Sequence, residues 1–163
     1  MKNKKMVIFF AITIIIIIIT LIYFALRPKS EPPVIPEKDL TSEEIGVKSQ
    51  ADTFTNTWGN FTDNASQGYL ESIKPFLSET AYEEQAEVAE SQKYFNEQSG
   101  EPLAQKYTIK KVELIERSTE DSEVLTYKIT AVREFADQTQ DSTTYIKYQK
   151  IEGNWKIISI ESD

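Results

Sequence analysis

The pattern of hydrophobic and polar positions divides the chain into four parts. Residues 6–26 form an uncharged apolar stretch without glycine or proline, residues 27–38 are rich in proline, and residues 39–163 mix polar and apolar positions. At 1.5 Å per residue, the 21 residues of the apolar stretch span about 31 Å as a helix, which matches a hydrocarbon core of roughly 30 Å. The pattern therefore predicts a transmembrane helix over 6–26, after a cytoplasmic tail of residues 1–5.

The charges that flank this stretch predict its orientation. Three lysines precede residue 6, whereas only Arg27 and Lys29 follow residue 26 closely. Positive charge favours the cytoplasmic side, so we expect the N-terminus in the cytoplasm and the remaining chain outside the cell membrane. No small-residue cleavage pattern follows the apolar stretch, which favours an uncleaved signal-anchor over a removable signal peptide.

Residues 27–38 hold four of the six prolines of the chain. Proline fixes φ and pushes the preceding residue into extended conformations, so this segment is typical of a semi-rigid spacer with a reach of up to about 37 Å. Two interpretations stay open: a stalk that lifts the following domain towards a partner, or an ordinary linker.

Helical spacing dominates the first half of residues 39–163. Thr41 and Glu44 have the T-x-x-E spacing of a capping box, which predicts a helix start. The apolar residues that follow share one helical stripe: Val47, Ala51, Phe54, Trp58 and Phe61. We expect a second helix over 67–74, ended or restarted by Pro75, and a third helix from Ser78 to about Asn96.

The second half has the two-residue period of strands. Apolar positions nearly alternate from Tyr107 to Leu114, with Lys110 and Lys111 inserted as a bulge would insert them. Further strands are expected over 124–131, 143–151 and 155–160, with polar turns at 116–122 and 137–142 and a short glycine-containing hairpin loop at 152–154. Helices followed by strands indicate an α+β fold, in which three helices pack on a curved, cone-like, four-stranded antiparallel sheet.

Composition narrows the function. The part after residue 26 contains 15 basic and 26 acidic residues, a net charge of −11, which disfavours nucleic acid as a partner. The chain has no cysteine and no histidine, so thiolate catalysis, Cys-ligated metals and the commonest general base are excluded. No Ca²⁺-loop spacing is present. We therefore expect no catalytic, metal or cofactor residues.

The ending of the chain carries a resemblance. Gly153, Trp155, Lys156 and Ile157 form a terminal "G-x-W-K-I" strand, and Phe54 and Trp58 lie where a first helix is expected. Together with the order of helices and strands over residues 41–161, this resembles the nuclear transport factor 2-like superfamily. The single anchor and linker are similar to the VirB-type bitopic scaffold proteins of type IV secretion and conjugation machines. That resemblance implies an assembly role, with self-association or contact with other membrane-complex proteins, and no catalysis.

The same fold can also enclose a cavity between helices and sheet. The side chains that we expect to line it are aromatic: Phe54, Trp58, Tyr69, Tyr82, Tyr107, Tyr127, Tyr145 and Trp155. An isomerase-like site would need a carboxylate base in such a cavity. Glu113 and Glu134 are the candidates, but acidic side chains in polar runs are more often solvated, so an enzyme is disfavoured. The remaining alternative to an assembly module is a small-ligand-binding or sensing domain.

Overall fold

The computed structural model describes residues 32–61, 66–99, 104–118, 123–135 and 138–162, all within one compact unit, Pro32–Asp163. The transmembrane helix predicted for residues 6–26 lies outside the described residues. Among the helices that are described, none is long and apolar enough to cross a membrane.

Helix α2, Ser42–Gly59, begins at the predicted capping box. The Glu44 amide donates to Thr41 Oγ1 at 3.2 Å, and the Thr41 amide donates to Glu44 Oε2 at 2.6 Å. These two bonds satisfy amides that have no partner within the helix. The predicted stripe is confirmed for Val47, Ala51 and Phe54, which are buried against the sheet, and Trp58 is partly buried. Phe61 lies beyond the end of the helix at Gly59.

Two further helices follow, as predicted. Helix α3, Gln67–Ile73, is capped by Ser66 and continues at Pro75 into a 3₁₀ turn, Lys74–Phe76. Helix α4, Glu79–Ser99, is capped by the Ser78 hydroxyl, which accepts from the Ala81 amide at 3.2 Å. Helix α4 runs three residues beyond the expected end at Asn96. The caps at Thr41 and Ser78 are local, which is why the sequence predicts the starts of the first and third helices.

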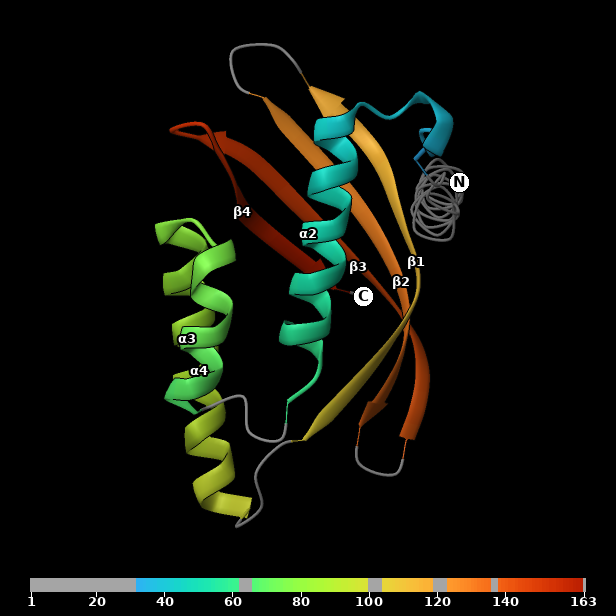
Figure 1. Cartoon of the computed structure of the whole chain (residues 1–163). Helices are drawn as coiled ribbons and strands as arrows, with labels where there is room; N and C mark the ends of the chain where they lie inside the picture. Colours follow the sequence, from blue (N-terminus) through green and yellow to red (C-terminus); the bar gives the residue numbers. More distant parts are fainter. Residues whose placement is uncertain (1–31, 62–65, 100–103, 119–122, 136–137, 163) are drawn as a thin grey trace, which may run out of the picture. The chain divides into compact units, whose positions relative to one another are not determined.

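The four strands pair as an antiparallel sheet in the order β1-β2-β3-β4 (Figure 1). Their bounds are β1 Gln105–Ser118, β2 Val124–Phe135, β3 Gln138–Ile151 and β4 Asn154–Ser162. The turns predicted at 116–122 and 137–142 were too long, because β1 continues to Ser118 and β3 already begins at Gln138. Polar side chains on the solvent side of a strand resemble a turn in sequence, although their backbones are paired.

The predicted bulge is confirmed by a register shift between Ile109 and Lys111. A second shift lies between Leu114 and Glu116, and a third lies in the β3 and β4 pair between Lys147 and Tyr148. Bulges bend a strand and increase its twist, so three of them account for the curvature of this sheet. The curved sheet leaves a concave face, which the helices cover.

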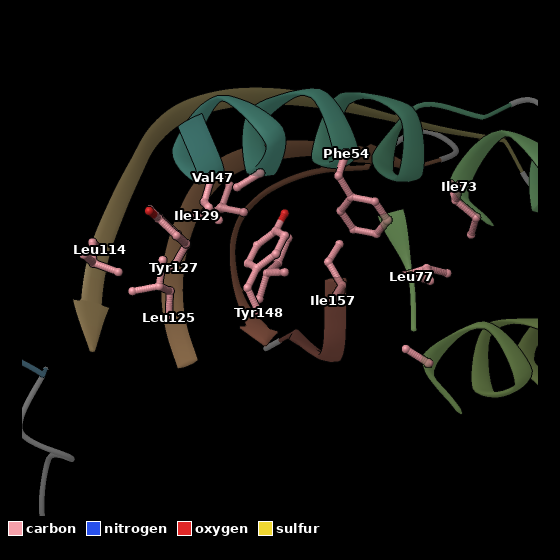
Figure 2. Close-up of a cluster of buried hydrophobic side chains, with 13 residues drawn as sticks. Val47, Phe54, Ile73, Leu77, Leu114, Leu125, Tyr127, Ile129, Tyr148 and Ile157 are labelled. Atoms are coloured by element: carbon pink, nitrogen blue, oxygen red, sulfur yellow. The ribbon is translucent and has the colours of Figure 1, made fainter. Parts of the chain in front are cut away.

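The core lies between helix α2 and the concave face of the sheet (Figure 2). Tyr127 and Tyr148 sit at its centre with no exposed surface, and their rings meet edge to face with centroids 6.0 Å apart. Phe54 closes the core from the helix side.

Part of the proline-rich segment belongs to this unit. The Ile35 amide donates to the Leu114 carbonyl at 2.8 Å, at the outer edge of β1, and Ile35 and Leu40 pack against the core. Residues 32–38, predicted as spacer, therefore lie on the domain in this structure. A 3₁₀ turn, Glu37–Asp39, connects them to α2.

Candidate functional site

The eight aromatic residues expected around a cavity occupy three different environments. Trp58, Tyr69 and Tyr107 line a cavity of about 340 Å³ at one end of the space between helices and sheet. Phe54 and Tyr127 are fully buried in the core and fill space that the prediction left open. The other three, Tyr82, Tyr145 and Trp155, lie elsewhere.

The walls of the cavity are aromatic. The rings of Trp58 and Tyr107 meet edge to face at 5.9 Å between centroids, and those of Phe61 and Tyr69 do so at 5.4 Å. An antiparallel bridge between Phe61 and Gln105 holds the chain after α2 beside the start of β1. The end of α2, the start of α3 and the start of β1 thus bring these rings together.

Hydrogen bonds fix the aromatic walls. Trp58 Nε1 donates to Gln85 Oε1 at 3.0 Å, and the Tyr69 hydroxyl donates to the Trp58 carbonyl at 3.1 Å. Burial raises the pKa of the Tyr69 hydroxyl, so this group stays a neutral donor at physiological pH. The Tyr107 hydroxyl lies 2.9 Å from Ser142 Oγ. The cavity is therefore shaped by side chains that are already held in place.

The sequence interpretation missed the polar side chains of this cavity. Gln85, Gln92, Gln105 and Arg133 all line it. The sequence does indicate an inward position for Arg133. It follows Tyr127, Ile129 and Ala131 at two-residue steps, which places it on the same inner face of β2. The sequence interpretation did not single out the three glutamines: Gln85 and Gln92 reach the cavity through the packing of α4, and Gln105 lies at the start of β1.

The centre of the predicted cone is filled. The Tyr127 hydroxyl donates to the Glu44 carbonyl at 2.6 Å, and burial raises its pKa. Tyr148, which was not expected to face inward, occupies the space beside it. A cavity remains open at the end of the cone near Trp58 and Tyr107.

Tyr82 and Tyr145 do not line this cavity. Tyr82 packs partly buried against the core, with the Lys74 ammonium 5.0 Å from its ring centroid. Tyr145 lies between Thr144 and Ile146, which are fully buried, so its side chain lies on the opposite face of the sheet. The prediction for Tyr145 is corrected because an aromatic residue on a strand does not itself reveal which face is inward.

Trp155 instead belongs to a cluster that ties the last hairpin to helix α2. Trp155 Nε1 donates to Glu43 Oε1 at 2.8 Å, and the Lys150 ammonium lies 2.7 Å from the same oxygen and 2.9 Å from Glu123. Lys150 lowers the pKa of the Glu43 carboxyl, and both carboxylates raise the pKa of Lys150. This cluster has an evident structural role, as it joins three elements.

The two carboxylates considered as catalytic bases lie away from the cavity. Glu113 pairs with Lys111 at 2.6 Å, and Glu134 pairs with Lys106 at 3.7 Å. No acidic residue is among the described side chains that line the cavity. An isomerase-like arrangement, with a carboxylate base inside an apolar cavity, is therefore not formed by the described side chains that line this cavity.

Comparisons with known proteins define the class of the fold. No family model and no curated protein matches the sequence. A periplasmic fragment of TraM matches the structure with a TM-score of 0.58 and 12% identity, over 76% of this chain and 98% of that fragment. The structure therefore has the same α+β fold as this fragment.

A second match is TraH, from the Gram-positive conjugative plasmid pIP501. Its TM-score is 0.55 at 15% identity, over 77% of this chain and 95% of TraH. CagV, a VirB8 homologue from Helicobacter pylori, matches with a lower TM-score of 0.49 and 11% identity, over 71% of this chain and 95% of CagV. The chain thus shares its α+β fold, three helices and a four-stranded antiparallel sheet, with the TraM fragment and with TraH.

Proposed function

We propose that this chain is a single-pass membrane protein that presents its α+β domain outside the membrane as a protein-interaction module. Residues 6–26 form the anchor, and the domain acts as a scaffold subunit of a conjugation or type IV secretion-like machine. The observation that carries the proposal is the fold match to TraM, because the matched fragment is periplasmic and is covered almost completely. The match to TraH, which comes from a conjugative plasmid, supports the same role.

The chemistry of the domain supports binding by surface and shape. The sequence has neither cysteine nor histidine, and Phe54, Tyr127 and Tyr148 pack in the core between α2 and the sheet. The partners are other subunits of the membrane complex or further copies of this chain. Nucleic acid is not among them, because the part after residue 26 carries a net charge of −11.

Cross-linking in native membranes tests the assembly role. The chain has no cysteine, so single cysteines can be placed at exposed positions of three elements: Ser49 in α2, Glu87 in α4 and Lys147 in β3. A photoreactive maleimide attached to these cysteines is expected to give, at one position or more, a covalent product with a second copy or with another membrane protein. The cysteine-free parent is the control.

One result would contradict the proposal. If all three variants give no product in native membranes, and the full-length chain is a strict monomer by light scattering, the domain does not act as an assembly module.

A further inference from the structure

The outer edge of β1 is occupied by the chain itself at both ends and is open between them. β1 is the first strand of the described sheet, so one of its edges has no neighbouring strand there (Figure 1). At one end of this edge Phe61 and Gln105 exchange two backbone hydrogen bonds, and at the other end the Ile35 amide donates to the Leu114 carbonyl. No backbone group of the other described residues pairs with the stretch between these two contacts.

The backbone groups of Ile109 and Val112 point towards this open stretch. In an antiparallel sheet the N–H and C=O of one residue point to the same side, and the side alternates along the strand. Leu114, Val112 and Ile109 pair with residues of β2 that follow each other at two-residue steps, and the carbonyl of Leu114 points outwards to Ile35. Ile109 and Val112 share that outward orientation. Because the bulge lies between them, their spacing matches two residues of a regular strand.

A groove of about 790 Å³ lies between this edge and helix α2 and gives the edge apolar walls. Besides Ile109 and Val112 it is lined by Val34 and by Ile45 of α2, whose exposed fractions are 43% and 50%. Extended peptides add to exposed sheet edges as a further strand. Main-chain bonds then supply affinity, and alternate side chains enter pockets beside the edge. The groove has both features.

The lysines of the edge are bound elsewhere. Lysines on an edge strand normally hinder the addition of another strand. Here Lys110 Nζ lies 2.6 Å from Asp141, and Lys111 Nζ lies 2.6 Å from Glu113. Asp141 belongs to β3, two strands away from the edge, so the Lys110 side chain extends across the sheet. Both charges are therefore neutralised by carboxylates of the chain itself.

The groove also has a carboxylate that lacks a cation. Each lysine of its lining pairs with a carboxylate, as Lys48 does with Glu37 at 2.7 Å. Among the described residues, the partner of the Asp52 carboxylate is instead the neutral Asn56 amide at 3.2 Å. The part of the chain after residue 26 carries a net charge of −11. A basic segment is therefore attracted to this groove, whereas a second copy of this acidic chain is repelled.

We propose that the groove between β1 and α2 binds an extended basic segment of another subunit, which adds to the sheet as a strand of about three to five residues. The backbone of the segment pairs with the outward groups of Ile109 and Val112. Its alternate apolar side chains contact Val34 and Ile45, and a lysine or arginine lies beside Asp52. This inference rests on the proposed function and deepens it, because it names the surface that an assembly partner occupies and the chemistry of that partner.

The test titrates two peptides onto the full-length chain in detergent micelles. Acetyl-Lys-Thr-Val-Thr-Val-amide and the reversed acetyl-Val-Thr-Val-Thr-Lys-amide bring a lysine to Asp52 in either strand direction. The readout is NMR of the Ile109 and Val112 backbone amides, with the buried Ile146 of β3 as internal control. We expect saturable shifts of both edge amides with at least one peptide, and slower exchange of these amides with solvent. No saturable shift with either peptide up to about 10 mM would overturn the proposal.

The same amides report any other occupant of the edge. In the chain without peptide, both amides should exchange rapidly with solvent. Slow exchange at every protein concentration would show that another segment of this chain covers the edge. Protection that grows with protein concentration would show that a second copy does. Either result would overturn the proposal.

Matched peptides separate strand addition from attraction between charges. Peptides that are N-methylated at every residue keep the lysine and the apolar side chains but cannot donate backbone hydrogen bonds. They should bind at least about tenfold more weakly, because two or more hydrogen bonds are lost. Equal binding of the methylated and unmethylated peptides would contradict strand addition.

Variants of exposed side chains assign the binding to the groove. Asp52→Asn should weaken binding of the peptide about two- to fivefold, and Ile45→Ser about fivefold. Glu87→Gln makes the same charge change at an exposed position of α4 and should leave binding unchanged. An unshifted Ile146 amide shows that a variant is folded. If both groove variants bind the peptide as tightly as the parent chain, the assignment is wrong. Failure of the peptides beside a cross-linked product in native membranes would overturn the groove and leave the assembly role standing.

Discussion

At the scale of single residues, the two buried tyrosines of the core differ in one hydrogen bond. The Tyr127 hydroxyl donates to the Glu44 carbonyl at 2.6 Å, whereas the Tyr148 hydroxyl is buried with no hydrogen-bond partner among the described residues. Removing a hydroxyl that forms a hydrogen bond costs about 1 kcal/mol of stability. Removing a buried hydroxyl that forms none loses no bond and relieves the penalty of burying an unpaired polar group. We therefore expect Tyr127→Phe to lower the free energy of unfolding by about 1 kcal/mol, and Tyr148→Phe to leave it unchanged or to raise it.

Urea denaturation of the two variants, compared at equal m-values, measures this difference. The substitutions remove the same atom from neighbouring rings, so each serves as the control for the other. A Tyr148→Phe variant that loses as much stability as Tyr127→Phe would show that the Tyr148 hydroxyl is satisfied in solution.

A second residue-scale prediction concerns the ion pair at the start of α2. Arg117 Nε lies 2.6 Å from Glu44 Oε1 and Arg117 Nη2 lies 3.0 Å from Glu44 Oε2, and the Glu44 side chain is only 8% exposed. Arg117→Met would leave that buried carboxylate without its cation. Because Arg117 itself is 37% exposed, we expect a loss of about 2 kcal/mol, which is less than for a fully buried pair.

The matched control for this prediction is Lys110→Met. Lys110 pairs with Asp141 at 2.6 Å, but both side chains are well exposed, so the loss should stay below about 1 kcal/mol. Chemical denaturation of both variants gives the comparison. Equal losses would mean that burial of Glu44 does not strengthen its pair.

At the scale of elements, two glycines in helix α2 should respond oppositely to the same substitution. A Cβ on Gly59 would lie 2.7 Å from Tyr107 Cγ, whereas a Cβ on Gly46 would meet nothing within 4 Å. Gly59→Ala forces α2 away from β1 and should cost about 1–3 kcal/mol. Gly46→Ala should raise stability by roughly 0.5–1 kcal/mol, because alanine favours the helix more than glycine does.

Thermal unfolding measures both glycine variants directly. The contrast matters because Gly59 is the point where α2 approaches the wall of the cavity. If Gly59→Ala is as stable as Gly46→Ala, the close contact between α2 and Tyr107 is not present in solution.

The starts of the helices were predictable from the sequence, whereas the lengths of the strands were not. Thr41 and Ser78 act within three residues of themselves, so their caps are visible in the sequence. Strand ends depend on backbone pairing with a neighbouring strand, which the residues of the strand itself do not reveal. Gln138, for example, pairs with Phe135 and begins β3 although its surroundings are polar.

The cavity was predicted only in part, for a similar reason. The aromatic residues of α2 and β1 were found from their period, as Trp58 and Tyr107 show. Which aromatic side chains fill the cone and which leave a cavity depends on packing between distant elements. Tyr148 takes up space that the sequence interpretation left free, and Tyr145 lies on the other face of the same strand.

At the scale of the whole molecule, the structure alters the expected length of the spacer. Residues 32–38 lie along the domain, held by the bond from Ile35 to Leu114, and so belong to the compact unit. The sequence does not reveal the bond between Ile35 and Leu114, because the prolines at both ends of residues 27–38 predict the same extended conformation.

The proposed topology is the central claim, and single-cysteine labelling tests it most directly. The cysteine-free chain allows Asn3→Cys in the predicted tail and Thr80→Cys at an exposed position of α4. Protoplasts or spheroplasts that express either variant are treated with a membrane-impermeant maleimide. We expect labelling of Cys-substituted position 80 in intact cells, and labelling of position 3 only after lysis. Protection of position 80 until lysis would contradict the account.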